Sequence, residues 1–405
     1  MSSTDPTHPQ PALRLPESLL YAIGAGIGGS GLNAVALESL RASQGGGFLG
    51  RAVALANQQS EIPTHKIVSL RYHPVKVLSF LPRPNYTGAK RQAVDHRAAR
   101  ELANGPYDFF HGWSGDCLLT LREAARRGIP SVLEIPTWHR NKGNPTPRFT
   151  QKELARAAEP FPRSLLNRML VSRQRVLDEY DLATRILVLS EKARETFLSV
   201  GIPAEKLFMM HRGVDPGVFT PAESPPEKFR AIFVGALIRR KGLPVLLEAW
   251  RKAALPNSEL ILVGGISPEI GNLLAERPSD TIHAIGQHHD VASALRSASI
   301  HVFPSELEGS AKVTYEAAAC GLPQITTREA GDVVLDQVTG WIIPPRNVEA
   351  LVETLRAAHA DPARLVRMGA AARQRILENF TWDHFRARLL LAYSEALTAR
   401  RAGMG

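Results

Sequence analysis

Short apolar runs alternate along the chain with longer stretches whose apolar residues recur at helical spacing. A short apolar run favours a buried strand, and the helical spacing favours an amphipathic helix. The predicted strands are Leu19–Ile23, Val53–Leu55, Ile67–Leu70, Phe109–Phe110, Val132–Ile135, Ile186–Leu189, Ala231–Val234, Leu260–Val263, Ile282–Ile285, Ile300–Phe303 and Gln324–Thr326. Predicted helices between them include Ser114–Arg127, Ser190–Val200, Pro244–Ala254 and Val291–Ser297. This alternation predicts an α/β fold with mostly parallel sheets.

A proline-rich segment divides this pattern into two halves. Residues 215–226 contain four prolines and one glycine in twelve positions, which is typical of a connector between domains. We expect a polar, disordered lead-in at 1–16 that is no signal peptide, a Rossmann-like domain at 17–215, a linker at 216–228 and a second Rossmann-like domain at 229–380. The last segment, 381–405, is predicted to form a helix with apolar positions that include Phe385, Leu389 and Tyr393.

Composition places the chain among globular proteins. It has 405 residues, of which 44% are hydrophobic and 22% charged, and no apolar run approaches the roughly 20 residues that span a bilayer. Cys117 and Cys320 are the only cysteines, so neither a disulfide scaffold nor a zinc site is expected. These features predict a reduced, cytoplasmic protein.

The positive charge is concentrated in the first half. Residues 1–215 carry 28 Lys and Arg against 19 Asp and Glu, whereas residues 216–405 carry 21 against 20. Such an excess favours an anionic partner, and simple solubility charge is the alternative. Aromatic residues do not interleave with the basic ones, so we expect no nucleic acid. An acidic lipid surface or a phosphorylated acceptor remain.

The stretch that follows the strand Ile300–Phe303 carries the clearest chemical signal. Pro304-Ser305 ends the strand, a loop with Glu308 follows, and a helix containing Glu316 stops at Gly321-Leu322-Pro323. Unpaired N–H groups at a helix start form an anion site. Two acids beside such a site suit a ligand with both phosphates and hydroxyls, such as a nucleotide sugar. The alternative is an ordinary strand–loop–helix with two solvated glutamates.

The pattern Pro304-Ser305-x-x-Glu308-Gly309-x6-Glu316-Ala317-x-Ala319-x-Gly321-x-Pro323 resembles the E-x7-E signature of retaining GT-B glycosyltransferases of glycosyltransferase family 4. The resemblance implies two Rossmann-like domains facing a central cleft, with the C-terminal helix crossing back to the first. It makes 17–215 the acceptor domain and 229–380 the nucleotide-sugar domain. In this family Glu308 would contact donor-sugar hydroxyls and Glu316 the ribose, and the N–H groups of Gly309, Ser310, Ala311, Lys312 and Val313 would hold the diphosphate.

The opening of the second domain resembles the phosphate-binding segment of the same family. Gly235 follows the strand Ala231–Val234, and Arg239-Arg240-Lys241-Gly242 comes soon after. Lys241 matches the family lysine that would neutralise the departing diphosphate, and a fixed cation aimed at such charge stabilises its development. The family arginine that directly follows the glycine is replaced by Ala236, so Arg239 or Arg240 is expected to supply that charge. The alternative is a basic surface loop.

The first glycine loop allows two interpretations. Gly24, Gly26 and Gly29 satisfy the dinucleotide fingerprint G-x-G-x-x-G, which would make the chain an NAD(P)-dependent Rossmann oxidoreductase. The acid that this fingerprint expects is missing from Arg51–Ser60. Family 4 enzymes carry a Gly-Gly loop at the same place, and the resemblance therefore assigns Gly28 and Gly29 to the donor phosphates or the acceptor. A tight structural turn is the simplest alternative.

Other segments match the family less specifically. Asp108-Phe-Phe-His111-Gly-Trp113 resembles its Asp-x-x-His segment, so His111 would contact a donor hydroxyl or the reaction centre. Gly264 and Gly265 would border the nucleotide, and the turn at Gly286 would pass the base. Arg212 stands where the family has asparagine.

The resemblance implies a hexosyltransferase that takes a UDP-, GDP- or ADP-sugar, without a further cofactor. Because no Asp-x-Asp occurs, no metal site is expected. The partners would be the donor and a glycan, lipid-linked or other anionic acceptor, with an anionic membrane surface at the inner face of the membrane as a further hypothesis. A nucleotide-sugar-binding protein that has lost turnover is the non-catalytic alternative.

Overall fold

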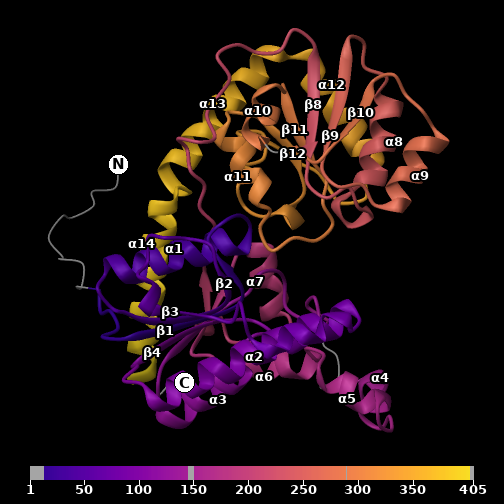
Figure 1. The fold of residues 1–405 in the computed structure, drawn as a ribbon. Coiled ribbons are helices and arrows are strands. Elements are labelled where there is room, and N and C mark those ends of the chain that lie inside the picture. Colours follow the sequence, from indigo (N-terminus) through magenta and orange to yellow (C-terminus); the bar gives the residue numbers. More distant parts are fainter. Residues whose placement is uncertain (1–12, 145–149, 289, 402–405) are drawn as a thin grey trace, which may run out of the picture. The chain divides into compact units, whose positions relative to one another are not determined.

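The computed structural model describes residues 13–144, 150–288 and 290–401 (Figure 1). Contacts divide them into two compact units. Unit 1 comprises the described residues within Met1–Glu134, Pro147–Leu187 and Arg386–Gly405, and unit 2 those within Ile135–Thr146 and Val188–Phe385. The sequence places the boundary at 216–228, whereas by these contacts the main part of unit 2 already begins at Val188.

A seven-stranded sheet with the order β3-β2-β1-β4-β5-β6-β7 contains all the strands predicted in the first half. Its neighbours from β3 to β6 pair in parallel. The strand β7 was not predicted. The strands are β1 (Leu19–Ile27), β2 (Leu49–Asn57), β3 (Ile67–Ser69), β4 (Phe109–Trp113), β5 (Ser131–Glu134), β6 (Arg185–Val188) and β7 (Leu207–Met209).

Helices connect these parallel strands, as crossover connections require. They are α1 (Leu32–Gly45), α2 (Arg83–Asn104), α3 (Leu118–Arg127), α4 (Gln151–Ala157), α5 (Arg163–Arg168) and α6 (Arg173–Leu182), with 3-10 turns η1 (Thr64–Lys66) and η2 (Pro74–Phe80). The helix α3 begins at Leu118 and not at the predicted Ser114. The reason is a turn before it, in which the N–H groups of Gly115 and Cys117 donate to the buried Glu179 carboxylate at 2.5 and 3.1 Å.

The last helix, α14 (Trp382–Arg401), returns the chain to unit 1 from Arg386 onward. Its Tyr393 is wholly buried and packs against Phe48 and Phe109, with ring centroids 6.0 and 5.0 Å apart. Arg386 forms an ion pair with Glu38 of α1. The predicted C-terminal helix that crosses back to the first domain is therefore confirmed.

A six-stranded parallel sheet with the order β10-β9-β8-β11-β12-β13 forms the centre of unit 2. Its strands are β8 (Phe229–Val234), β9 (Ser258–Val263), β10 (Ile282–Gly286), β11 (Ile300–Phe303), β12 (Gln324–Thr326) and the unpredicted β13 (Gly340–Ile342). The helices are α7 (Glu191–Leu198), α8 (Leu243–Ala253), α9 (Pro268–Glu276), α10 (Val291–Arg296), α11 (Lys312–Ala319), α12 (Val348–Ala360) and α13 (Pro362–Asn379), with 3-10 turns η3 (Ala204–Lys206), η4 (Arg239–Lys241) and η5 (Arg328–Ala330).

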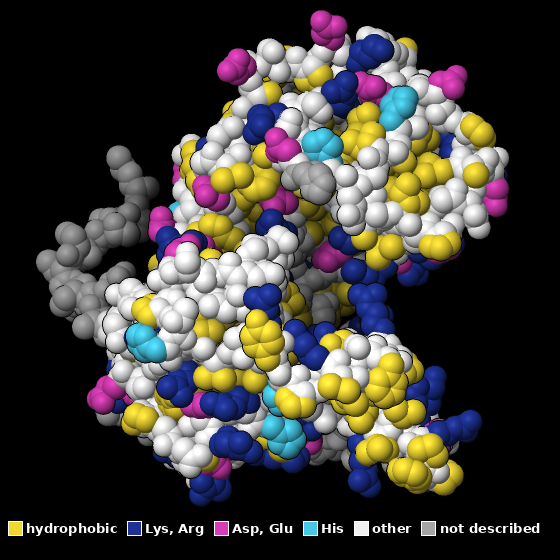
Figure 2. All heavy atoms as spheres, viewed as in Figure 1, with side chains coloured by type: hydrophobic (Ala, Val, Ile, Leu, Met, Phe, Trp, Pro, Cys, Tyr) yellow, Lys and Arg dark blue, Asp and Glu magenta, His cyan; other side chains and the backbone are white. Residues whose placement is uncertain are grey.

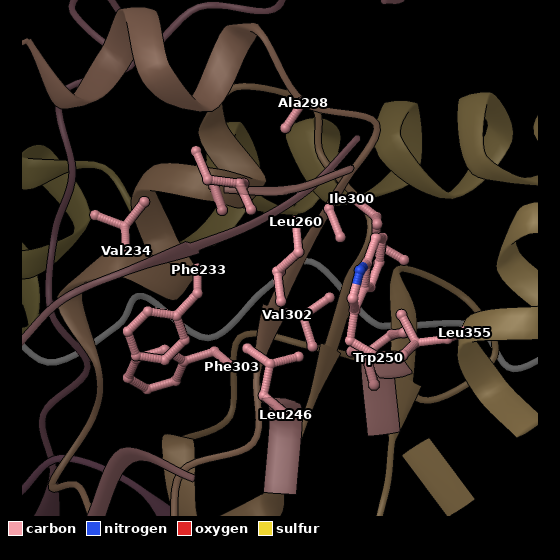
Figure 3. Packing of buried hydrophobic residues seen from close by; sticks show 14 of the residues in the cluster. Phe233, Val234, Leu246, Trp250, Leu260, Ala298, Ile300, Val302, Phe303 and Leu355 are labelled. Carbon is pink, nitrogen blue, oxygen red and sulfur yellow. The ribbon is translucent and has the colours of Figure 1, made fainter. Parts of the chain in front are cut away.

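The core of unit 2 is an apolar layer between this sheet and its helices (Figure 3). Phe233 of β8 and Phe303 of β11 stack with their ring centroids 5.3 Å apart. Trp250 of α8 and Leu355 of α12 belong to the same buried cluster. Because both phenylalanines lie near the carboxyl ends of their strands, this core directly supports the loops that follow β8 and β11. Within the described part of the chain, no helix is long and apolar enough to cross a bilayer.

Candidate active site

The carboxyl ends of β8, β9, β10 and β11 form one edge of the six-stranded sheet, where ligands of open α/β sheets usually bind. The loop after β11 carries Glu308, and α11 follows it with Ala311 at its N-cap. The side chain of Glu308 is 17% exposed, so it keeps access to solvent. Glu316 lies inside α11, and its carboxylate pairs with Lys312 one turn earlier.

Two cations from η4 converge on the Glu308 carboxylate. Its Oε1 lies 3.6 Å from Nζ of Lys241 and 3.1 Å from Nη1 of Arg240. Arg240 also donates to the carbonyl of Leu307. The Ser305 hydroxyl lies 3.5 Å from the same oxygen. One carboxylate thus fixes two positive groups at a single point of the edge.

Lys241 is further positioned by the aromatic core beneath it. Its Nζ lies 5.2 Å from the centroid of the Phe303 ring, a cation–π arrangement. Arg239 points elsewhere, since its Nε donates to Glu269 of α9 at 2.5 Å. Of the two arginines proposed to replace the family arginine, the structure therefore brings Arg240 to Glu308 and keeps Arg239 in an exposed ion pair.

Two glycines let the backbone come close at this edge. Gly235 and Gly264 have φ values of +144° and +146°, which L side chains rarely adopt. A Cβ on Gly235 would lie 3.1 Å from Nζ of Lys241, and a Cβ on Gly264 would lie 1.9 Å from the carbonyl oxygen of Gly235. Gly264 also donates its N–H to the Gly286 carbonyl at 2.7 Å. The ends of β8, β9 and β10 are thereby linked to one another next to the lysine.

Gly265 has more room than its neighbour. The nearest atom to a Cβ built there is Nε2 of Gln287, at 3.6 Å. Gly286 has a φ of +72° and nothing within 4 Å of such a Cβ. These two predicted contacts of the nucleotide and its base thus lie at the same sheet edge as Gly264, and space remains beside them.

Side chains from distant segments hold the loop between Glu308 and α11 in place. The Ser190 hydroxyl donates to the Gly309 carbonyl at 2.7 Å, and Nε of Arg212 donates to the Ser310 carbonyl at 3.2 Å. The Ser310 hydroxyl lies 2.8 Å from the hydroxyl of Tyr315. Ser190 and Tyr315 were missed as supports of this loop, because nothing in their local pattern shows which distant segment they contact.

The backbone donors of this loop are not all available to a diphosphate. The N–H of Ala311 donates to the Ala330 carbonyl at 2.8 Å, and that of Glu308 to the Glu329 carbonyl at 3.0 Å. Ala311 is therefore already used in holding the loop against the segment that follows β12. The remaining predicted donors, at Gly309, Ser310, Lys312 and Val313, lie around the start of α11 as expected.

A buried histidine lies in the sheet below the lysine. His301 of β11 is wholly buried, and its Nδ1 lies 3.0 Å from the Gln324 side-chain oxygen. Burial lowers the pKa of His301 to about 4; the bond to Gln324 opposes this effect and the charge of Lys241 adds to it. The imidazole is therefore neutral at neutral pH and adds no positive charge to the site.

The Gly-Gly loop belongs to unit 1. Gly28 and Gly29 follow β1 with φ values of +86° and +98°, and the Gly28 N–H donates to the Asn33 carbonyl at 3.0 Å. The preceding Gly24 donates its N–H to the Asp116 carboxylate at 2.7 Å, and a Cβ on Gly24 would lie 2.6 Å from that carboxylate. A pyrophosphate that approached Gly24, the first glycine of the dinucleotide fingerprint, would meet the Asp116 carboxylate, which disfavours the NAD(P) interpretation.

His111 also lies in unit 1, and it is wholly buried on β4. Its Nδ1 lies 2.8 Å from the hydroxyl of Tyr393, and its Nε2 lies 3.4 Å from a carboxylate oxygen of Glu134. A histidine enclosed in this way supports the interior of unit 1. This placement does not fit the contact with a donor hydroxyl that the resemblance implies.

Comparison with known proteins places these features in a family. The model "Glycosyltransferase Family 4" matches residues 53–218, and the model "Glycosyl transferases group 1" matches residues 219–375. An MMP alpha-(1->4)-mannosyltransferase of Mycolicibacterium hassiacum is 28% identical over 319 residues, or 74% of each chain. A GDP-mannose-dependent alpha-(1-6)-phosphatidylinositol monomannoside mannosyltransferase of Mycolicibacterium smegmatis is 28% identical over 56% of this chain and 66% of its own length.

Solved structures agree on the fold. A sucrose-phosphate synthase of Thermosynechococcus elongatus superimposes with a TM-score of 0.68 at 20% identity, covering 94% of this chain and 100% of its own. HepE of Anabaena, solved in complex with UDP-glucose, gives 0.65 at 16% identity over 93% of this chain and 98% of its own. The predicted α/β class with two Rossmann-like sheets is confirmed. The two family models together span residues 53–375, and the chain belongs to the family 4 glycosyltransferases.

Proposed function

We propose that this chain is a retaining, nucleotide-sugar-dependent glycosyltransferase that acts on a glycan or lipid-linked acceptor in cell-surface polysaccharide or glycolipid synthesis. The observation that carries the proposal is the convergence of Lys241 and Arg240 on Glu308, next to the close-packed strand ends at Gly235 and Gly264. Two cations and a carboxylate suit a donor that presents a diphosphate beside sugar hydroxyls. The whole set comes from the unit that the group 1 model matches.

In the proposed reaction the bond between the sugar C1 and the diphosphate oxygen breaks, and its electron pair leaves with that oxygen. Lys241 and Arg240 neutralise the charge that develops there. Fixed groups of this kind typically lower the activation barrier by about 3 kcal/mol each. The acceptor hydroxyl oxygen bonds to C1 on the same face, and its proton passes to the departing phosphate oxygen. Such a reaction needs no protein nucleophile and, we propose, no metal.

The donor is a UDP-, GDP- or ADP-sugar in this proposal. The names of the relatives support a nucleotide sugar without selecting the base, since one relative is GDP-mannose-dependent and a structural neighbour was solved with UDP-glucose. The open surroundings of Gly265 and Gly286 are where a base would be distinguished. Local shape at these positions, and not the shared motif, decides which nucleotide fits.

The first test is a thermal-shift titration of the wild type with UDP, GDP, ADP, their common sugar conjugates and NADH. We expect one nucleotide diphosphate to stabilise the protein and the Lys241→Ala variant to lose the shift, because binding to the native state alone raises the unfolding temperature. Stabilisation by NADH alone would contradict the proposal. NMR of the transferred sugar then shows whether the anomeric configuration is retained, and nucleotide binding without any transfer would favour a non-catalytic binding protein.

The acceptor side of the proposal starts from charge. The excess of Lys and Arg in residues 1–215 motivates a cytoplasmic enzyme that works at an anionic membrane surface carrying its acceptor. Sedimentation with liposomes tests this idea. Equal recovery with neutral and anionic lipid would contradict it.

A further inference from the structure

A pocket of about 580 Å³ opens on unit 1 between η2 and α2. Its walls are apolar and come from three segments: the residues are Leu70, Val75, Leu78, Ala89, Ala93 and Met169. None of the predicted site residues lines it. Apolar concavities of this kind are where proteins usually bind hydrophobic groups.

Two arginines border these apolar walls. Arg97 and Arg100 of α2 line the pocket together with His96 of the same helix and His73, the N-cap of η2. Arg97 pairs with Glu101 through its Nη2 at 2.5 Å, but its buried Nε has no hydrogen-bond partner among the described residues. The exposed Arg100 guanidinium makes no hydrogen bond or ion pair with any described residue. Two arginines thus have donors to offer to an anion at the pocket.

The wall formed by Met169 is held firmly in place. Asn85 and Gln92 of α2 donate from their side chains to the carbonyls of Leu166 and Arg168, at 2.7 and 2.8 Å. Between them lies Gly88, where a Cβ would stand 1.9 Å from the Met169 carbonyl oxygen. This close approach is possible only because Gly88 has no side chain. The pocket is therefore a built feature of the fold.

The surface around the opening is also apolar and basic. Tyr72, Val77 and Phe80 are 89, 75 and 77% exposed; Arg71 directly precedes Tyr72, and Lys76 lies between Tyr72 and Val77 in sequence. Figure 2 shows further hydrophobic side chains gathered among Lys and Arg over the nearby α4 and α5. Side chains of this mixture suit the boundary between lipid headgroups and acyl chains.

We propose that this pocket binds the hydrocarbon chain of a lipid phosphate, while Arg97 and Arg100 bind its phosphate. The apolar walls match the chain, and the arginines match the anion, since guanidinium groups bind phosphate through several donors at once. A free phosphate would leave the apolar walls without a role. If the lipid is the acceptor or carries it, which rests on the proposed function, the pocket holds the acceptor by its tail.

Calorimetric titration with monomeric dodecyl phosphate, kept below its micelle concentration, tests the pocket without any transfer reaction. We expect it to bind at least about tenfold more tightly than inorganic phosphate, because the chain contributes burial that phosphate lacks. The Ala93→Trp variant fills the pocket and should abolish the difference. The Arg100→Glu variant, at an exposed position, should weaken binding by about tenfold or more. Lys228→Glu, with the same charge change in unit 2, should leave it unaltered.

Three results would contradict the proposed lipid-phosphate site. They are equal affinity for dodecyl phosphate and inorganic phosphate, unchanged binding in both the Ala93→Trp and Arg100→Glu variants, and binding to anionic vesicles without binding to monomeric dodecyl phosphate. The last would identify a membrane surface instead. Nucleotide binding, measured on the same preparations, keeps the two proposals apart. A wild-type protein that binds dodecyl phosphate but no nucleotide would contradict the proposed glycosyltransferase function and would still support the lipid site.

Discussion

Lys241 has little freedom of direction at the edge of the six-stranded sheet. Its ammonium group is held between the Glu308 carboxylate at 3.6 Å and the Phe303 ring at 5.2 Å, and its side chain is 18% exposed. A lysine fixed in this way loses little further rotamer entropy when an anion arrives. Glu308 therefore serves the site twice in our proposal, as a contact for donor hydroxyls and as a guide for the lysine.

We expect Lys241→Ala and Glu308→Gln each to lower kcat at least about tenfold, corresponding to about 1.4 kcal/mol of barrier. Steady-state transfer assays measure this. Arg239→Ala is the matched control. This substitution also removes one positive charge from η4, but Arg239 pairs with Glu269 and not with Glu308. A loss of activity in the control as large as in Lys241→Ala would contradict the assignment.

His301 predicts an acid-dependent loss of stability. With its pKa lowered to about 4 by burial, the folded protein holds it neutral where the unfolded chain, with a pKa near 6.5, takes up a proton. Stability from this residue is thus complete above pH 6.5 and is lost as the pH falls toward 4, by about 3 kcal/mol. The buried Nε2 has no partner among the described residues, so a proton there would have no acceptor.

The measurement is the free energy of unfolding in urea between pH 7 and pH 4. His301→Asn should be less stable at pH 7 but should show a flatter pH dependence, because asparagine cannot be protonated in this range. An equally steep decrease in both proteins would show that other groups cause it.

At this scale the sequence predicted which residues come together after the strand ends, and their function stays a prediction. Lys241, Glu308 and Gly235 lie where an α/β sheet places its ligands, and Arg240 and Glu308 meet although they lie 68 residues apart. The surroundings of His111 could not be predicted in the same way. Its partner Tyr393 lies 282 residues further on, and only the folded structure shows that the two side chains are buried together and within hydrogen-bond distance.

Among the elements, the closely spaced ends of β8 and β9 set a strict condition on the site. Gly264 must have no Cβ, because that atom would overlap the Gly235 carbonyl. The same contact places the backbone next to Lys241. The edge therefore requires glycine at 264, whereas at Gly235 the φ of +144° would strain any other residue.

Gly264→Ala should destabilise the protein by more than about 1 kcal/mol and reduce nucleotide affinity, because alanine is strained at this φ and clashes with Gly235. Gly271→Ala provides the control inside α9, where the nearest atom to a new Cβ is 3.8 Å away. That change should stabilise the protein by up to about 1 kcal/mol. Urea unfolding and calorimetry report both effects, and equal behaviour of the two variants would contradict the argument.

Most strands were visible in the sequence because each is a compact apolar run. The two that were missed, β7 and β13, have three residues each, but so do β3 and β12, which were predicted. The difference lies in composition. The strand β3 contains Ile67 and Val68 and β12 contains Ile325 and Thr326, whereas β7 has no β-branched residue and β13 begins with Gly340.

On the scale of the whole molecule, the stability of unit 1 depends on α14, which follows unit 2 in the sequence. Tyr393 fills a space lined by Phe48, Phe109 and His111, all of which come from the first part of the sequence. Tyr393→Ala should cost unit 1 about 3–5 kcal/mol, and Tyr393→Phe only about 1 kcal/mol, because it removes one hydrogen bond and keeps the ring.

Hydrogen exchange distinguishes the two units in this experiment. We expect Tyr393→Ala to lose protection in peptides from β4, while peptides from β11 and the nucleotide affinity of unit 2 remain as in the wild type. Loss of protection in β11 to the same extent would show that the two units unfold as one.

The return of α14 also governs the order in which the protein can mature during translation. Ribosomes deliver the chain from its amino end, and domains generally fold as they emerge. Unit 2 contains no residue beyond Phe385, whereas the interior of unit 1 lacks Tyr393 until α14 has been made. The part synthesised first is therefore finished last, and its exposed apolar surface is the part of the nascent chain that chaperones have reason to cover.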